Sequence, residues 1–216
     1  MKSLKKSISH LYNLDSIYMN YLETIKIADA HPCNLEYHVK RMEHTIGRSL
    51  PLHLQPEPHL CKGLVKCRVV YNHSSIISIE YLPYHIPVIK SLTQVECNNL
   101  DYHFKYQDRM RINQLKSIHC NPEEDILIIK NGFITDTSFC NIVFENNQGL
   151  FTPSTPLLNG TKRQYLLDTG QIQECVITKN DFHKYSKIRL INAMIDLHEL
   201  VIPGCIGELC CGHSHK

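Results

Sequence analysis

The sequence predicts an α/β (α+β) protein of two domains, and three observations support this fold class. Short apolar runs recur along the 216 residues and are typical of strands. Fewer segments have the spacing or boundary signals of helices. A polar stretch near residues 98–102 separates the halves, so we expect a small N-terminal domain over residues 1–100 and a larger C-terminal domain over residues 101–216.

The first half contains one predicted helix among several predicted strands. The helix is expected over residues 35–46, where apolar side chains recur every three or four positions and Asn34 can cap the first turn. The strands are expected over residues 21–27, 66–71, 76–82 and 88–96. Because only the four residues NHSS separate the second strand from the third, these two are predicted to form a hairpin.

The second half continues the mixture of helices and strands. One helix is predicted over residues 109–119, and another is expected to begin near Gly160 and to end at Gly170. The dipeptide Asn131-Gly132 lies between two apolar runs and is the strongest short-range signal for a hairpin. The strands are expected over residues 126–130, 133–136, 140–144, 150–152, 171–177 and 187–195.

Composition argues against several classes of protein. Lys and Arg exceed Asp and Glu by 23 − 21 = 2 without a long basic run, so nucleic acid is not a favoured partner. No segment approaches the ~20 apolar residues that a membrane span requires. The polar N-terminal sequence lacks the apolar stretch of a secretory signal, so we expect a cytoplasmic protein whose ten cysteines are mostly reduced.

Lys105 is a candidate for covalent chemistry because it lies between Phe104 and Tyr106. An ammonium that loses hydration to aromatic neighbours has a lowered pKa, which suits a lysine that forms a Schiff base. Most lysines instead lay their stem on apolar neighbours and keep the charge in water. Spacing alone leaves both interpretations open.

Two places have features that bind anions. The segment LLNGTKR begins a helix with amide N–H groups beside Gly160, an arrangement that binds phosphate but that most helix starts share. Arg41 lies on the polar side of the first helix and could clamp a phosphate, or pair with solvent and a neighbouring acid. Neither feature is specific by itself.

Asp136 stands at the end of a predicted buried strand and is followed by two hydroxyl residues and Asn141. An aspartate in such a position commonly caps a turn. The alternative is that it balances a buried cation, such as the protonated nitrogen of a pyridine ring.

In order along the chain, these segments resemble the class IV, or fold type IV, pyridoxal-phosphate enzymes, a family that includes aminodeoxychorismate lyase, branched-chain aminotransferases and D-amino acid aminotransferases. YLETIKIADAHPCNLEYHVKRM is similar to the family's opening, and FKYQDRMRINQL is similar to its Schiff-base lysine segment. DTSFCNIVF followed by FTPSTPLLNGTKR looks like its signature. The similarity runs from about Tyr21 to Leu197.

The resemblance implies a two-domain fold with pyridoxal 5'-phosphate between the domains, and a homodimer. Lys105 would form the Schiff base and move the proton at the substrate's α-carbon, and Asp136 would face the pyridine nitrogen. Arg41 would bind the cofactor phosphate. The residues implied at the cofactor are Arg41, Lys105, Asp136, Asn141, Gly160, Thr161, Lys162 and Asn192.

The chain departs from the family pattern at positions that bear on substrate. Asp136 replaces the usual glutamate, and Asn72-His73 stands where many relatives have Arg-Gly. Met110 stands where branched-chain aminotransferases have a tyrosine, which together with YLETIKI favours aminodeoxychorismate lyase, an enzyme that forms 4-aminobenzoate and pyruvate for folate synthesis. An aminotransferase acting on a branched-chain or D-amino acid is the alternative, and a non-catalytic cofactor or metal carrier is the second alternative.

The C-terminal tail places four soft-metal ligands within six residues: Cys210, Cys211, His213 and His215. Ligands that are close in a terminal tail need not bind a metal specifically. We therefore assign no metal site from the sequence.

Overall fold

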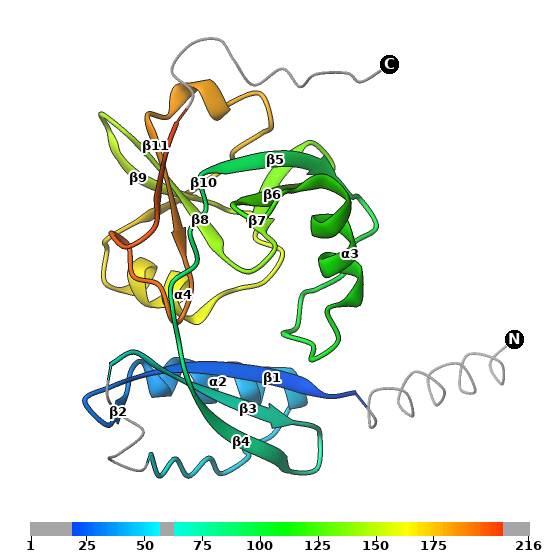
Figure 1. Ribbon diagram of the computed structural model, residues 1–216, viewed down its shortest axis with the longest axis vertical. Coiled ribbons are helices and arrows are strands. Elements are labelled where there is room, and N and C mark those ends of the chain that lie inside the picture. Colours follow the sequence, from blue (N-terminus) through cyan, green and yellow to red (C-terminus); the bar gives the residue numbers. More distant parts are fainter. Residues whose placement is uncertain (1–18, 57–62, 205–216) are drawn as a thin grey trace, which may run out of the picture. The chain divides into compact units, whose positions relative to one another are not determined.

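The computed structural model describes residues 19–56 and 63–204, which form two compact units (Figure 1). Unit 1 comprises the described residues up to His85 together with Phe104–Arg109. Unit 2 comprises Ile86–His103 and the described residues from Met110 onward. The chain therefore crosses between the units three times, whereas the sequence predicted a single boundary near residues 98–102.

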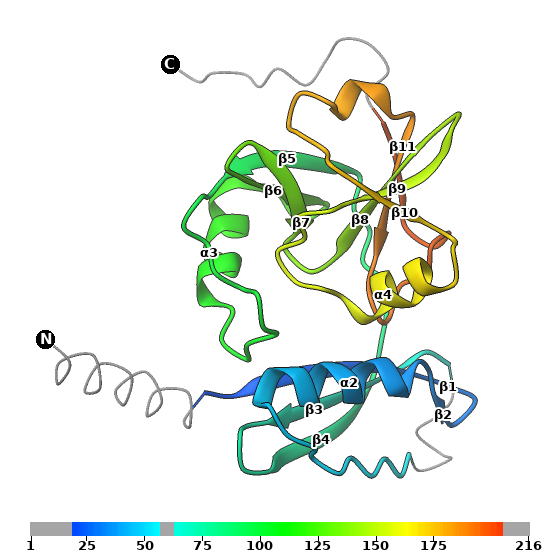
Figure 2. The same cartoon turned by 180° about the vertical axis from the view of Figure 1, so that it is seen from behind.

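Unit 1 is a four-stranded antiparallel sheet with one helix. The strand order is β2-β1-β3-β4. The bounds are β1 Tyr21–Ala28, β2 His31–Pro32, α2 Leu35–Ile46, β3 Val65–Tyr71 and β4 Ile76–Pro83. Alternate side chains of β1 are buried, and α2 lies along one face of the sheet (Figure 2). The helix packs Met42 and Ile46 into a cluster with Tyr21 and Tyr71.

The helix α2 has its predicted bounds, but the predicted cap at Asn34 is wrong. Asn34 has a left-handed backbone with φ of 52°, and its side chain makes no capping hydrogen bond. A capping residue normally has an extended backbone that aims its side chain at the amides of the first turn. The tight turn between β2 and α2 imposes a different conformation on Asn34.

The segment Phe104–Arg109 belongs to unit 1 because it adds to the edge of β1. The Leu22 amide donates to the Lys105 carbonyl at 2.9 Å. The ring of Tyr21 lies 6.1 Å from the ring of Phe104 and 5.7 Å from that of Tyr106, measured between centroids. These contacts were not visible in the local sequence pattern, which explains the misplaced boundary.

Unit 2 contains two sheets and two helices. The sheet orders are β10-β9-β8-β11-β12 and β5-β6-β7. The bounds are β5 Ser91–Glu96, α3 Met110–His119, β6 Glu124–Lys130, β7 Phe133–Thr137, β8 Asn141–Asn146, β9 Gly149–Pro153, α4 Thr161–Asp168, β10 Gln173–Cys175, the 3₁₀ helix η2 Phe182–Lys184, β11 Lys187–Ile191 and β12 Val201–Pro203. Because β5 pairs in parallel with β6, residues 86–103 fold with the second unit.

The hairpin predicted from Asn131-Gly132 is confirmed, since β6 pairs antiparallel with β7. Asn131 and Gly132 have φ values of 52° and 82°, the positive values that a tight two-residue hairpin turn requires. Three predicted strands are shorter than expected, because only Ser91–Glu96, Gln173–Cys175 and Lys187–Ile191 pair as strands. The three-residue strand β12 was not predicted, because so short a segment has no measurable periodicity.

Among the described residues, no helix is long and apolar enough to cross a membrane. The Cys and His residues of the tail, from Cys210 to His215, lie outside the described residues. Within residues 19–56 and 63–204, no group of three Cys, His, Asp or Glu side chains is arranged to hold a metal ion.

Candidate functional site

In unit 1, Arg41 is held by a buried acid that the sequence analysis did not identify. Arg41 Nε donates to Glu23 Oε1 at 2.8 Å, and its Nη2 donates to Glu23 Oε2 at 2.5 Å. His38 Nδ1 lies 2.6 Å from the same Oε2. Glu23 lies on β1 and is fully buried, whereas Arg41 and His38 lie on α2. The guanidinium is therefore oriented by the strand beneath it, in contrast to the solvated arginine that is the usual surface case.

Near neutral pH, Glu23 is ionised and His38 is neutral. Burial alone would raise the pKa of Glu23, but the charge of Arg41 and the hydrogen bonds from His38 and Arg41 outweigh it and lower that pKa to about 2. Burial also lowers the pKa of His38, despite the opposing effect of Glu23, and the charges of Arg41 and Lys105 lower it further. A neutral His38 therefore donates its Nδ1–H to an ionised Glu23.

Lys105 lies in the same unit, in the segment that adds to the edge of β1. Its carbonyl accepts from Leu22, and the flanking rings of Phe104 and Tyr106 both pack against Tyr21. The backbone on each side of the lysine is thereby anchored. Because its charge contributes to lowering the pKa of His38, the Lys105 side chain and the Glu23 group share one electrostatic environment.

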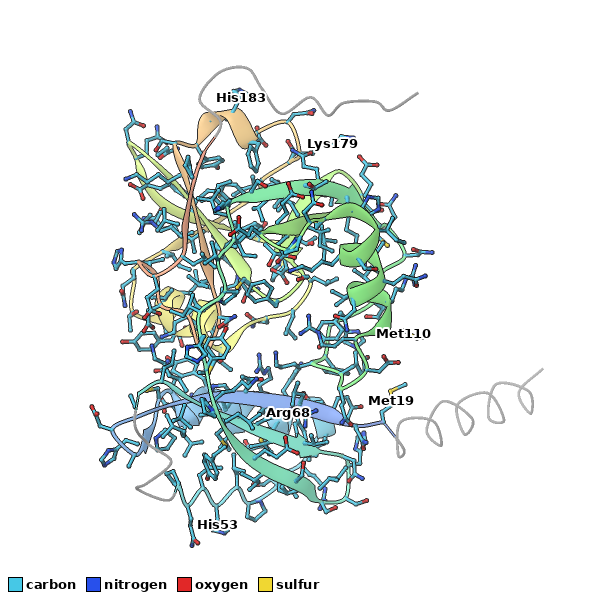
Figure 3. All side chains as sticks on the ribbon, viewed as in Figure 1. Met19, His53, Arg68, Met110, Lys179 and His183 are labelled. Carbon is cyan, nitrogen blue, oxygen red and sulfur yellow. The ribbon has the colours of Figure 1, made fainter. Side chains whose placement is uncertain are left out.

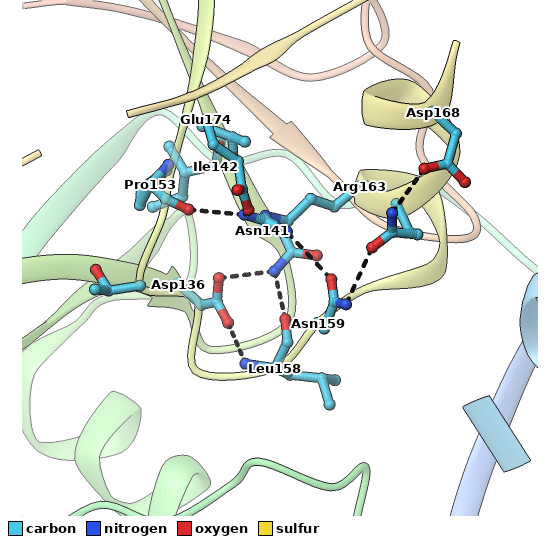
Figure 4. Close-up of polar contacts among 12 residues, drawn as sticks. Asp136, Asn141, Ile142, Pro153, Leu158, Asn159, Arg163, Asp168 and Glu174 are labelled. Carbon is cyan, nitrogen blue, oxygen red and sulfur yellow. Dashed lines mark hydrogen bonds and ion pairs between the residues drawn. The ribbon is translucent and has the colours of Figure 1, made fainter. Parts of the chain in front are cut away.

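In unit 2, Asp136 is a buried carboxylate with partners on both oxygens (Figure 4). Asn141 Nδ2 donates to Asp136 Oδ1 at 2.8 Å, and the Leu158 amide donates to Oδ2 at 2.8 Å. Asn141 Nδ2 also donates to the Leu158 carbonyl at 2.8 Å. The turn after β7 is capped instead by Thr137, whose Oγ1 accepts from the Cys140 amide at 3.0 Å. Asp136 is therefore not the turn cap, which was its commonest alternative role.

The pKa of Asp136 is raised from 3.8 to about 6. Burial is the main cause, and the hydrogen bonds from Leu158 and Asn141 together with the charge of Arg163 oppose it. At neutral pH the carboxylate is mostly ionised. A buried anion of this kind is suited to a cationic partner.

Gly160 is required by the position of Asn141. A Cβ atom at Gly160 would lie 1.9 Å from Asn141 Oδ1, closer than any real contact. The backbone of Gly160 is extended, with φ of −72° and ψ of 144°, so contact and not backbone conformation excludes a side chain here. The glycine lets the loop before α4 close on Asn141.

The other predicted cofactor residues have mixed surroundings. Thr161 and Lys162 begin α4 and are buried, and the Lys162 ammonium forms an ion pair with Asp196. The Asn192 side chain accepts from the Met194 amide at 2.8 Å and donates to the Phe139 carbonyl at 3.3 Å. The roles of these three residues toward a phosphate stay predictions.

Sequence reasoning missed Glu23, His38 and Arg163. A signal existed for Glu23, since it stands among apolar residues on the buried side of an alternating strand. No comparable signal existed for Arg163, because α4 lacks a clear apolar face that would distinguish it from its neighbour Lys162. Arg163 is nevertheless the more buried of the two.

The structure gathers the predicted residues into two groups. Arg41 and Lys105 lie in unit 1, with Glu23 and His38. The group in unit 2 comprises Asp136, Asn141, Gly160, Thr161, Lys162 and Asn192. The first group contains the cations Arg41 and Lys105 beside ionised Glu23, and the second contains the buried carboxylate of Asp136.

Comparison with known proteins reveals similarity along most of the chain. The family model for amino-transferase class IV matches residues 89–199. An uncharacterized protein of Haemophilus influenzae is 36% identical over 183 residues, which is 80% of this chain and 96% of that protein. The crystal structure of a "putative 4-amino-4-deoxychorismate lyase" from Haemophilus somnus is similar with 33% identity and a TM-score of 0.70, over 82% of this chain and 97% of that chain.

A more distant solved structure has the same fold. It is the PLP-bound form of a "hypothetical aminotransferase" from Mycobacterium tuberculosis, with 12% identity and a TM-score of 0.62, over 86% of this chain and 80% of that chain. At this identity the similarity concerns the fold alone. The mixed α/β architecture predicted from the sequence is confirmed by these matches.

Proposed function

Because the chain belongs to the class IV aminotransferase family, we propose that it is a pyridoxal-phosphate-dependent enzyme with aminodeoxychorismate lyase activity, forming 4-aminobenzoate and pyruvate. The observation that carries the proposal is the buried carboxylate of Asp136, held by Asn141 and Leu158 and ionised near neutral pH. An acid in this state needs a cationic partner. The protonated nitrogen of a pyridine ring is such a partner.

The residues present fit the cofactor. A carboxylate accepts up to about four hydrogen bonds, so Asp136 can accept one more from a protonated ring nitrogen. Arg41 is an oriented guanidinium suited to a phosphate. The amides that begin α4 are also of a kind that binds a dianion. Gly160 lets the loop before α4 close on Asn141, which holds the Asp136 carboxylate. Nothing in this set of donors conflicts with pyridoxal 5'-phosphate.

When bound, pyridoxal 5'-phosphate supplies an electron sink for the carbon beside the substrate's amino group. Asp136 would keep the positive charge on the ring nitrogen, and Asn141 would hold that carboxylate in place. Lys105 would take the proton from the substrate's α-carbon and return a proton when the product leaves. Arg41, held by Glu23, would fix the phosphate end and so the position of the ring.

Support for the lyase comes from the relative in Haemophilus somnus, whose name includes this activity and whose whole chain is nearly covered. Met110 adds nothing to the choice, because it begins α3 on the surface and is 72% exposed (Figure 3).

Asn72 also bears on substrate, since its Oδ1 accepts from the amides of Ser74 and Ser75 and closes the turn between β3 and β4. A turn-closing amide is a poor substitute for an arginine as a carboxylate ligand.

The second candidate is an aminotransferase, which returns the proton to the cofactor and then accepts another substrate. The matching family model, amino-transferase class IV, supports this alternative. Both candidates use the same residues for binding and proton movement. They differ in whether a leaving group is expelled from the substrate.

One experiment tests the function. The purified protein is expected to have a visible absorption band that borohydride removes, and to release pyruvate from aminodeoxychorismate. Lys105→Ala should abolish both the band and turnover, because no other group is proposed to hold the cofactor covalently or to move the proton. Retained turnover in Lys105→Ala would refute the proposal. A band with turnover of amino donors but without pyruvate would favour the aminotransferase.

We also propose a homodimer in the cytoplasm, as the family resemblance implies. Sedimentation equilibrium of the purified chain tests the assembly. A mass near 25 kDa would refute the dimer, and a mass near twice that value would support it. Fractionation of the source cells tests the location.

A further inference from the structure

Arg163 is a buried cation close to Asp136 that the proposed reaction does not use. Its side chain is 2% exposed, on the first turn of α4. Nη1 donates to Asn159 Oδ1 at 3.1 Å, Nη2 donates to the Pro153 carbonyl at 2.9 Å, and Nη2 also pairs with Glu174 Oε1 (Figure 4). This set of contacts needs the planar fork of an arginine.

These contacts clamp the two ends of one loop. Pro153 is the last residue of β9, and Asn159 lies two residues before α4 begins. Between them stands Leu158, whose amide donates to Asp136 and whose carbonyl accepts from Asn141. Arg163 therefore fixes the ends of the loop that holds the Asp136 carboxylate.

The charge of Arg163 is only partly compensated. Its ion-pair partner Glu174 is 49% exposed, so solvent screens that carboxylate. Its Nε is buried without a hydrogen-bond partner among the described residues. An unpaired buried N–H offsets part of the stability that the three contacts of this side chain provide. The guanidinium of Arg163 therefore keeps part of its positive charge in a buried site, where charges interact more strongly than in solvent.

Asp136 is the acid within reach of this charge. Its position on β7 faces Asn141 of β8, the amides of Leu157 and Leu158 in the loop, and Arg163 of α4. The charge of Arg163 lowers the pKa of Asp136 and so opposes the effect of burial, as do the hydrogen bonds from Leu158 and Asn141. The ionisation of Asp136 therefore depends on a residue that does not touch it.

We propose that Arg163 is a positioning residue for Asp136, which holds the loop 153–159 against the carboxylate and supplies the buried positive charge that favours its ionised form. The expected effect of Arg163 on turnover rests on the proposed function. Its expected effect on the ionisation of Asp136 does not, because that effect is present in the protein without cofactor. The competing explanation is that Arg163 is a structural clamp whose charge has no effect on Asp136.

Three variants separate these explanations. Arg163→Gln keeps hydrogen-bond donors for the loop but removes the charge, and Arg163→Lys keeps the charge but loses the fork. Glu174→Gln is the matched control, because it breaks the same ion pair and leaves the arginine charge in place. Thermal unfolding of each variant reports the structural contribution separately.

The first measurement is the pH at which Asp136 ionises in protein without cofactor. Carbon NMR of aspartate-labelled protein gives this value, with Asp136→Asn identifying the resonance. We expect Arg163→Gln to raise the midpoint by about one pH unit, the usual effect of removing a nearby opposite charge. Glu174→Gln should not raise it, and Arg163→Lys should raise it less than Arg163→Gln does, because lysine keeps the charge and loses only the fork that holds the loop. An unchanged midpoint in Arg163→Gln would overturn the proposal, even if thermal stability fell.

The second measurement is the pH profile of turnover. The acidic limb for Arg163→Gln should move to higher pH by the same interval as the NMR midpoint, and the limb for Arg163→Lys should move by a smaller interval. If Arg163→Gln does not fold, a raised midpoint in Glu174→Gln would overturn the proposal. Absence of pyruvate release in the parent protein would refute the proposed reaction but leave the NMR result valid.

Discussion

Replacing Gly160 by alanine tests the contact that closes the loop on Asn141. The new Cβ atom would lie 1.9 Å from Asn141 Oδ1, and ordinary contact begins at 3.4 Å, so the amide must move by 3.4 − 1.9 = 1.5 Å. Such a shift breaks both hydrogen bonds of Asn141 Nδ2, to Asp136 Oδ1 and to the Leu158 carbonyl. Each bond contributes about 1 kcal/mol, and its buried partner is left unsatisfied.

We therefore expect Gly160→Ala to lower the free energy of unfolding by about 2–4 kcal/mol. Backbone strain adds nothing, because alanine readily adopts the extended conformation of Gly160. Urea unfolding followed by circular dichroism measures the loss. The same change should weaken cofactor binding, since the Asp136 carboxylate loses its support.

A double-mutant cycle identifies the cause of this loss. In an Asn141→Ala background the obstructing amide is absent, so Gly160→Ala should cost less than about 1 kcal/mol. Gly170→Ala is the control: its φ of 68° makes alanine unfavourable there, but no atom lies within 4 Å of the added Cβ. Its cost should be the same with or without Asn141. An equal cost for Gly160→Ala in both backgrounds would refute the contact argument.

Two further predictions concern the buried acids. Glu23→Gln leaves the donors of Arg41 and His38 without a charged acceptor, so the free energy of unfolding should fall by about 3–5 kcal/mol in urea unfolding at pH 7. The pKa of Glu23 is lowered from 4.5 to about 2, so its stabilising effect is complete above pH 4.5 and is lost toward pH 2, a slope that the variant should lack. For Asp136 the pH dependence of stability has the opposite sign. Its pKa is raised from 3.8 to about 6, so the free energy of unfolding relative to Asp136→Asn should fall by about 3 kcal/mol between pH 4 and pH 7. A flat difference between those two proteins would show that Asp136 does not titrate near neutrality.

Features that depend on a few adjacent residues were predictable from the sequence. The hairpin at Asn131-Gly132 follows from the positive φ values that this dipeptide tolerates, and α2 follows from its apolar spacing up to Gly47. The cap at Asn34 failed because the preceding turn, and not the helix, determines its backbone conformation. Where two elements join, the turn between them overrides the local propensity of the residue.

Features that depend on distant partners were not predictable in the same way. Arg41 was recognised, but its partner Glu23 lies 18 residues earlier, on a different element. The donor to Asp136 Oδ2 lies 22 residues later, in a loop without a periodic pattern. Phe104–Arg109 was placed in the second domain because only pairing with β1 assigns it to unit 1. Such pairs form only when the folded chain brings distant segments together.

Two of the buried acids, Glu23 and Asp136, differ in a way that matches their proposed roles. Glu23 receives two hydrogen bonds from Arg41 and stays ionised at any physiological pH, so it can hold the guanidinium in one orientation. Asp136 receives only neutral donors, and Arg163 acts on it from a distance, so its pKa of about 6 leaves it responsive near neutrality. An acid that only positions another group benefits from a permanent charge. A buried acid with a pKa of about 6 changes its ionisation when a cation comes close, and Asp136 is such an acid.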